Sequence, residues 1–188
     1  MEEEREITIL IDCTKEELLN IFQKNNYNYL GTAKYYDIYM TNNNIDVTDE
    51  LDLLKRCVIL RQMIIDGEES YQILYKNKSI NKSGEITSQK NIKINIDSIE
   101  NSRMLFEKIG FHTLIEIEDN IEVYSNGKYE LAVQHVNNKH IYIELEDHNQ
   151  FSSIKEMKKV LIDLAIPIKN NDFFAKKALI ELKERYFD

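Results

Sequence analysis

Residues 141–146 read Ile-Tyr-Ile-Glu-Leu-Glu, so apolar and polar side chains alternate one by one. Residues 4–12 repeat the pattern, with isoleucines on one side and glutamates on the other near the start. A period of two is typical of a β-strand that has one buried face. The two segments therefore predict strands in which one face is apolar and the other carries carboxylates.

The rest of the chain predicts a meander of short strands with helices between them. Asp66-Gly67 is a strong hairpin signal, and Thr14-Lys15-Glu16-Glu17 fits a helix-capping box. Strands joined by such short turns pair in antiparallel fashion. The sequence predicts one α+β domain over residues 1–188, with about eight strands. The expected strands are 4–12, 28–41, 57–65, 70–75, 90–96, 111–124, 129–136 and 141–146, and the expected helices follow Thr14, Asp97 and Ser153 (the last ending before Pro167) and span 47–55 and 172–186.

The middle of the chain carries a predicted helix and a predicted loop. In the helix that begins near Asp97, we expect Leu105, Phe106 and Ile109 to form the buried stripe and Gly110 to mark the end. Residues 77–88 are polar and predict a loop.

The polar faces of the predicted strands have two interpretations. In an ordinary antiparallel sheet, one face packs on a core and the polar face meets water. Alternatively, helices cover the apolar faces, and the sheet curls so that its polar faces, including residues 115–118 (Ile-Glu-Ile-Glu), surround a cavity. Carboxylates inside such a cavity need water, cations or basic side chains to offset their charge. Periodicity alone does not choose between the two.

The charge of the chain argues against some classes of function. The net charge is −9 and the lysines form no basic stripe, which disfavours nucleic acid and anionic membranes as partners. No apolar run has the length of a signal peptide or a membrane span. Cys13 and Cys57 lack metal spacing and predict free thiols in a reducing cytoplasm. With five glycines in the chain, no glycine-rich phosphate-binding loop is present.

Six short segments, in order along the chain, resemble the motifs of one family. They are Glu4-Arg5-Glu6-Ile7-Thr8, Tyr36-Asp37-Ile38-Tyr39-Met40, Leu60-Arg61-Gln62-Met63, Ile73-Leu74-Tyr75-Lys76, residues 106–111, and Tyr142-Ile143-Glu144-Leu145-Glu146. They are similar to Glu-x-Glu-x-Lys, aromatic-Asp-x-Tyr-Phe, Leu-Arg-x-Arg, Leu-Thr-Tyr-Lys, Leu-Gly-Phe and Phe-x-Glu-x-Glu. These are motifs of the CYTH, or triphosphate-tunnel, superfamily, which contains class IV adenylyl cyclases and thiamine or inorganic triphosphatases.

The resemblance implies a fold and a chemistry. The fold is an eight-stranded antiparallel β-barrel, or tunnel, with helices packed outside. Inside it, basic residues grip a triphosphate and glutamates hold Mg²⁺ or Mn²⁺, hard cations that suit oxygen ligands. By position, the implied metal ligands are Glu4, Glu6, Glu144 and Glu146, and the implied phosphate-binding residues are Arg61 and Lys76. The simpler alternative is that these are solvated carboxylates and the isolated bases that balance them.

Other positions depart from the family's pattern and remove expected positive charge. Thr8 stands in place of the motif lysine, Met63 in place of the second arginine, and Gln134 in place of an aspartate. Residues 118–121, Glu-Asp-Asn-Ile, offer no base where a Lys-x-Arg pair is expected. On the strand that the family writes as Arg-x-Glu-x-Glu, the aligned residues are Gln89, Asn91 and Lys93.

These departures affect the expected charge balance. The four glutamates and two bases give −2, and a triphosphate of about −4 with two divalent cations leaves about −2 uncompensated. One unbalanced charge at about 4 Å costs roughly 4 kcal/mol at an effective dielectric constant of about 20, unless Lys78 or Lys93 points inward.

The sequence therefore predicts a divergent adenylyl cyclase-like or triphosphatase-like protein of reduced activity. The alternatives are a tunnel protein that binds its ligand without catalysis, and a structural protein whose sheet is open to water. A small phosphate anion is the expected partner, a homodimer is compatible with the sequence, and no residue is assigned as catalytic.

Overall fold

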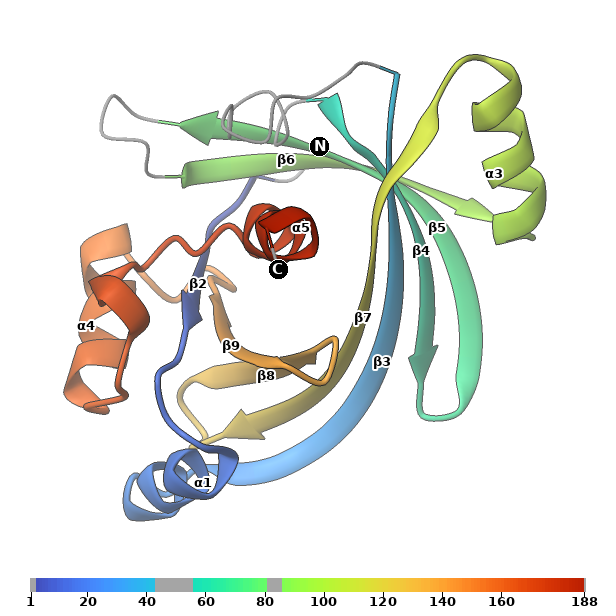
Figure 1. The fold of residues 1–188 in the computed structure, drawn as a ribbon. Coiled ribbons are helices and arrows are strands. Elements are labelled where there is room, and N and C mark those ends of the chain that lie inside the picture. The colour runs from blue at the N-terminus through green and yellow to red at the C-terminus, as the bar shows by residue number, and fades with distance from the viewer. Residues whose placement is uncertain (1–2, 43–55, 81–85, 188) are drawn as a thin grey trace.

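One strongly curled antiparallel sheet dominates the computed structural model, which describes residues 3–42, 56–80 and 86–187 (Figure 1). The strand order is β1-β6-β5-β4-β3-β7-β8-β9-β2. The strands are β1 (Glu3–Glu4), β2 (Glu6–Leu10), β3 (Asn28–Thr41), β4 (Val58–Ile65), β5 (Glu68–Ile80), β6 (Ile86–Ile96), β7 (His112–Ser125), β8 (Glu130–Val136) and β9 (His140–Glu146). The helices are α1 (Lys15–Lys24), α3 (Ile99–Lys108), α4 (Ile154–Asp163) and α5 (Lys177–Phe187), with a short 3-10 turn at Lys169–Asn171.

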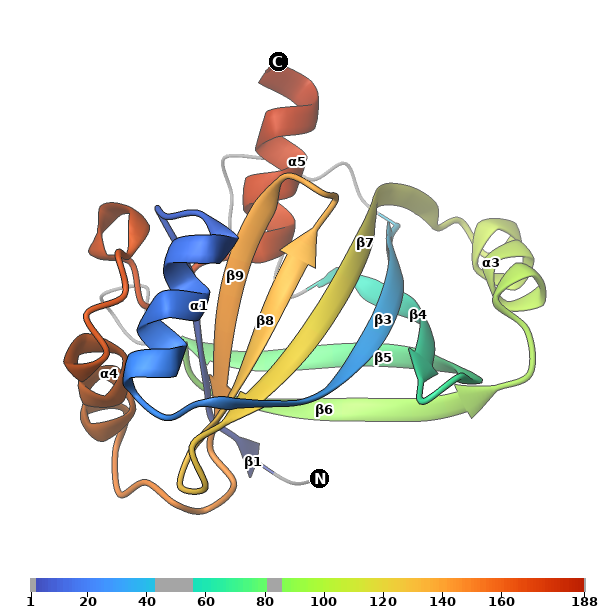
Figure 2. The same ribbon diagram turned by 90° about the horizontal axis from the view of Figure 1, so that it is seen from below.

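The first two strands are one segment of chain, interrupted only at Arg5. β1 pairs with β6 at one edge of the sheet, whereas β2 pairs with β9 at the other edge. Counted as chain segments, the described sheet therefore has eight strands, and it curls into a half-barrel (Figure 2). The predicted α+β class and antiparallel sheet are confirmed. None of the helices in the described ranges has the length and apolar character needed to span a membrane.

Helices α1 and α4 cover the convex side of the sheet over β2 and β9 (Figure 1 and Figure 2). Ile9 lies opposite Ile143 in the β2–β9 register, and both pack against Leu18 and Phe22 of α1 and against Met157 of α4, among others. Helix α1 begins as predicted, because Thr14 Oγ1 accepts from the Glu17 backbone while Glu17 Oε2 accepts from the Thr14 backbone. On these strands the apolar faces are thus buried under helices, and the polar faces point to the concave side.

Strand β7 presents its apolar residues, and not its glutamates, to the concave side, which is the opposite of the prediction for residues 115–118. Ile115 and Ile117 face the concave side, where they pack with Leu179 of α5. Glu116 lies on the outer face, where it accepts from Tyr36 Oη at 2.7 Å. Helix α5 sits inside the curl (Figure 1) and gives the apolar residues of β7 a partner there, a long-range contact that the local alternation does not contain.

Two further predictions on the middle of the chain are wrong. Of the three residues predicted to form the buried stripe of α3, Phe106 packs on the sheet together with Ile99, whereas Leu105 and Ile109 are 61% and 62% exposed. A shift of one residue turns a helix face by about 100°. The predicted loop 77–88 is strand at both ends, since β5 runs to Ile80 and β6 begins at Ile86. The predicted helix 47–55 lies outside the described residues.

The last helix begins later than predicted. Residues 172–176 are not helical; instead the backbone of Ala175 donates to Thr8 O at 2.8 Å, which ties this segment to β2. Helix α5 then begins at Lys177. This connection delivers the start of α5 to the concave side of the sheet.

Candidate functional site: a cation-rich pocket inside the curl

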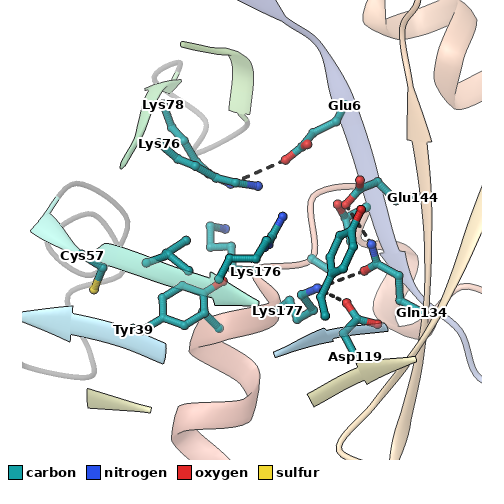
Figure 3. Close-up of a pocket in the computed structure, with 16 residues that line it drawn as sticks. Glu6, Tyr39, Cys57, Lys76, Lys78, Asp119, Gln134, Glu144, Lys176 and Lys177 are labelled. Carbon is teal, nitrogen blue, oxygen red and sulfur yellow. Dashed lines mark hydrogen bonds and ion pairs between the residues drawn. The ribbon is translucent and has the colours of Figure 1, made fainter. Parts of the chain in front are cut away.

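A cavity of about 110 Å³ lies between the concave side of the sheet and the start of α5 (Figure 3). Alternation along the strands explains its composition, because every second residue of a strand points to the same side. In the β5–β6 register, Lys76 lies opposite Asn91 and Lys78 opposite Gln89. The lining residues are Glu6, Thr8, Tyr35, Tyr39, Cys57, Ile59, Arg61, Lys76, Lys78, Asp119, Gln134, Glu144, Ala175, Lys176, Lys177 and Ala178.

Four of the six predicted site residues line this pocket: Glu6, Glu144, Arg61 and Lys76. Glu146 is exposed and is not among the lining residues. The side chain of Glu4 lies outside the described part of the structure, although its backbone pairs with Gln89. Their roles as metal and phosphate ligands stay predictions.

Some of the residues that depart from the family's pattern also line the pocket, and others do not. Thr8 and Gln134 line the pocket, whereas Met63 and Lys93 do not. Lys78, which the sequence left open, lines it beside Lys76.

The carboxylates of Glu6 and Glu144 both line the pocket, and their negative charges repel each other. Burial raises the pKa of Glu6, but Lys76 and Lys78 outweigh burial, so the pKa lies below its ordinary value. Burial also raises the pKa of Glu144, and the negative charge of Glu6 raises it further. Gln89 Nε2 donates to Glu6 Oε2 at 2.8 Å, and Gln134 Nε2 donates to Glu144 Oε2 at 3.3 Å. Glu144 is therefore the member of the pair that gains most from a nearby cation.

The lysine at the start of α5 is a site residue that sequence reasoning missed. Lys177 Nζ donates to Asp119 Oδ2 at 2.6 Å and to Gln134 Oε1 at 3.2 Å. Burial lowers the pKa of Lys177, but Asp119 and Asp37 outweigh it and raise the pKa overall. The second oxygen of buried Asp119 has no hydrogen-bond partner among the described residues.

Helix α5 is held in place by a buried carboxylate further along it. Glu181 accepts from Tyr142 Oη at 2.9 Å and from Asn137 Nδ2 at 2.9 Å, and it lies 2.8 Å from His140 Nδ1. These contacts join the helix to β9 and to the turn before it. They fix the position from which Lys177 enters the pocket.

The pocket has the opposite charge from the whole protein. Its lining contains five cationic side chains (Arg61, Lys76, Lys78, Lys176 and Lys177) and three carboxylates (Glu6, Asp119 and Glu144), a formal charge of +2. Counting Asp37, which pairs with Arg61, reduces this to +1. The chain as a whole carries −9. The four motif residues in the lining (Glu6, Arg61, Lys76 and Glu144) sum to zero, so the positive sign comes from Lys78, Lys176 and Lys177 against Asp119; Glu4 and Glu146 are outside this count.

The residues of the pocket suit a divalent metal ion only if a bound phosphate supplies some of its ligands. In the described ranges, no group of three or more His, Cys, Asp or Glu side chains is placed to hold a metal ion. Mg²⁺, however, is usually bound through one or two carboxylates together with water and substrate phosphates. Glu6 and Glu144 meet that smaller requirement.

Comparisons with known proteins point to one fold. No protein-family model matches the chain. The Methanocaldococcus jannaschii protein named "Putative adenylate cyclase MJ0240" is 24% identical over 184 residues, which cover 96% of this chain and 98% of that protein. The PH1819 protein of Pyrococcus horikoshii OT3 has a similar structure, with a TM-score of 0.73 and 15% identity over 97% of this chain and 99% of the other. The resemblance to the CYTH superfamily is confirmed.

A third comparison concerns a structural neighbour with a described activity. It is the Hippeastrum protein HpAC1, described as a putative adenylyl cyclase that reveals a dominant triphosphatase activity. Its TM-score is 0.61, with 14% identity over 96% of this chain and 95% of that one. At this identity the likeness shows the shared fold, and the chemistry of this chain has to be argued from its own pocket.

Proposed function

We propose that this CYTH-type protein binds the phosphate chain of a triphosphate or nucleotide in the pocket between the sheet and α5. The observation that carries the proposal is the excess of cationic side chains there, in a protein whose net charge is −9. Ammonium and guanidinium groups are the natural partners of phosphate oxygens. Keeping several of them together in a half-buried site costs free energy unless an anion offsets their charge.

The sheet is proposed to close into the tunnel that the family resemblance implies. The N-terminal segment supports this, since its β1 part pairs with one edge of the sheet and its β2 part with the other. Closure around Glu6 encloses the pocket on the side opposite α5. A shielded pocket of this kind strengthens each charge interaction, because water screens it less.

A divalent cation, Mg²⁺ or Mn²⁺, is proposed to join the phosphate at Glu6 and Glu144, with Glu4 and Glu146 as further candidates on the same strands. When bound, it would offset phosphate charge and polarise the P–O bond that breaks. Basic side chains of the protein hold the phosphate groups in place: Lys76 and Lys78 from β5 and Lys177 from α5. Positioning and charge stabilisation of this kind are the main contributions to phosphoryl transfer.

The size of the cavity favours hydrolysis of a triphosphate over cyclisation of ATP. About 110 Å³ is small beside the roughly 300–1,000 Å³ of pockets that enclose a whole drug-sized ligand. A phosphate chain fits such a space better than a complete nucleotide does. The activity is proposed to be reduced, because Arg61 and Lys177 are each already paired with an aspartate.

Those two ion pairs also favour a second candidate function, a tunnel protein that binds a phosphate anion without turning it over. Asp119 belongs to residues 118–121, which offer no base where the family's pattern has a Lys-x-Arg pair, and it forms an ion pair with Lys177. The two candidates share a binding site and differ in whether a product forms. A cytoplasmic location is proposed for either, since Cys13 and Cys57 are free thiols.

The test measures binding and turnover on the same protein. Tripolyphosphate, thiamine triphosphate and ATP are each titrated by calorimetry and then incubated with Mg²⁺ or Mn²⁺, and phosphate, pyrophosphate and cyclic AMP are quantified. We expect micromolar binding of tripolyphosphate and slow release of phosphate. Binding with no product from any of the three supports the second candidate. Folded protein that binds none of them overturns both.

A matched pair of variants tests whether tripolyphosphate binds in this pocket. Lys76→Met removes a lining cation, whereas Lys159→Met removes an exposed lysine of α4 that pairs with Asp163. We expect the first to weaken tripolyphosphate binding about tenfold and the second to leave it unchanged.

A further inference from the structure

The ammonium group of Lys78 lies close to Glu6, the carboxylate proposed to bind a metal ion. Its Nζ is 3.8 Å from Glu6 Oε1, and the two side chains are 13% and 12% exposed. Gln89, opposite Lys78 on β6, donates to the other oxygen of Glu6 at 2.8 Å. Each oxygen of the Glu6 carboxylate therefore faces a donor from the chain itself. Figure 3 shows the contact with Lys78.

A divalent cation and the Lys78 ammonium compete for Oε1 of Glu6, because both are attracted to the same negative charge. Two cations that share one carboxylate oxygen repel each other strongly in a site screened from water. Either the metal displaces the ammonium or the ammonium keeps the metal out. The two cations act in the same direction. Each offsets negative charge of Glu6 and Glu144, and each presents positive charge to a phosphate oxygen.

Nearby cations oppose a divalent ion at Glu6 more than they oppose the Lys78 ammonium, because the divalent ion carries twice the charge. They act on the lysine too: burial lowers the pKa of Lys78, and Lys76 and Lys177 add to this against the opposite effect of Glu6, so that the pKa is about 8. Lys76 lies two residues earlier on the same face of β5, and Lys177 enters from α5. With the ammonium groups in place, the lining together with Asp37 carries a formal charge of +1, so that a polyphosphate meets a positive site before any metal arrives. Adding a divalent cation to such a site is opposed by the charges already present.

We propose that Lys78 takes the place of a divalent cation at Glu6, so that the pocket binds a polyphosphate anion in the absence of metal; a metal that joins the bound phosphate is then held at Glu144 and not at Glu6. The proposal rests on the proposed function, because it concerns how the same anion is held. It assigns Lys78 as the residue that determines whether binding depends on metal. Removal of Lys78 should open Glu6 to a metal ion and make binding metal-dependent.

The experiment is a calorimetric titration of tripolyphosphate into the full chain, in EDTA and separately in Mg²⁺, for the wild type, Lys78→Met and Lys90→Met. Lys90 is the matched control, an exposed lysine on β6 that does not line the pocket. We expect Kd of the wild type and of Lys90→Met to change less than about threefold between EDTA and Mg²⁺. For Lys78→Met we expect a loss of at least about tenfold in EDTA and recovery in Mg²⁺.

A second measurement uses Mn²⁺ without any phosphate. Electron paramagnetic resonance counts free Mn²⁺ during titration, and we expect Lys78→Met to bind the ion at least about tenfold more tightly than the wild type. Circular dichroism confirms that the variant is folded. If it does not fold, the wild-type titrations in EDTA and Mg²⁺ still decide the matter.

The outcomes separate this inference from the proposed function. A wild type that binds tripolyphosphate only in Mg²⁺ overturns the inference and leaves the proposed function standing. A wild type that binds in neither buffer overturns the proposed function, and the inference with it. A Lys78→Met protein that binds as well as the wild type in EDTA also overturns the inference.

Discussion

The guanidinium of Arg61 donates two hydrogen bonds to Asp37, from Nε to Oδ1 and from Nη2 to Oδ2, and each is 2.6 Å long. The two residues lie opposite each other on β3 and β4. Bidentate pairs of this geometry are among the stronger ion pairs in proteins. The guanidinium carbon also lies 4.7 Å from the ring centroid of Tyr35. Arg61, which the sequence assigns to phosphate, therefore has a structural partner within the wall of the pocket.

Asp37→Asn is expected to destabilise the protein. The variant leaves the Arg61 guanidinium mostly buried without a counter-charge, and breaking a buried pair on one side costs about 3 kcal/mol or more. Urea denaturation measures the free energy of unfolding. The double variant Asp37→Asn/Arg61→Met removes both charges and should regain most of the loss. Lys34→Met breaks an exposed pair with Glu118 and serves as the control, at about 0–1 kcal/mol.

The same pair makes stability depend on pH in acid. Burial raises the pKa of Asp37, but Arg61 outweighs it, so the pKa in the folded protein lies below the ordinary value. Such a carboxyl stabilises the fold above the unfolded pKa of about 3.9, and this contribution is lost as the pH falls through the folded pKa. We expect the unfolding free energy of the wild type to fall below about pH 4 more steeply than that of Asp37→Asn. Equal acid slopes in the two proteins would show that the pair does not contribute.

Variants of the pair formed by Lys177 and Asp119 are expected to change anion binding in opposite directions. Lys177→Met removes a pocket cation, and tripolyphosphate affinity should fall about tenfold. Asp119→Asn removes the charge that neutralises Lys177, and affinity should rise by about the same factor. Calorimetry at constant ionic strength measures both, since salt screens such interactions. Changes in the same direction would indicate that the variants act through the fold and not through charge.

The grouping of residues by strand face was predicted correctly, because the period of two is a local property of the chain. Which face turns inward was not: the family resemblance, and not alternation, selected Glu6, Glu144 and Lys76, which line the pocket, and on β7 the isoleucines face inward. Lys78 was left open because its segment is polar and reads as a loop. In the structure, that polarity belongs to strands whose inner face borders a charged pocket, with Lys78 opposite Gln89.

The contribution of α5 could not be predicted from the local pattern. Lys177 enters the site because Ile115, Ile117 and Tyr142 give the helix an apolar surface inside the curl. That arrangement joins segments that are far apart in the sequence. Lys176 and Lys177 fell inside the predicted helix 172–186, and nothing in the local pattern distinguished them from its other charged residues. Leu105 was misplaced for a related reason, since tertiary packing decides which face of a short helix is buried.

Thr8→Lys is expected to strengthen anion binding, whereas Met63→Arg is not. Both changes restore a base of the family's motifs, but only Thr8 lines the pocket, where its backbone lies opposite Glu144. A new ammonium there adds positive charge beside a carboxylate whose pKa is raised by burial and by Glu6, so the tripolyphosphate Kd should fall about tenfold. Met63 is not among the lining residues, and its variant should change Kd less than about twofold. Calorimetry in EDTA and in Mg²⁺ checks both variants. An equal gain from the two would mean that net charge alone attracts the anion, and that the position of each base inside the curl is unimportant.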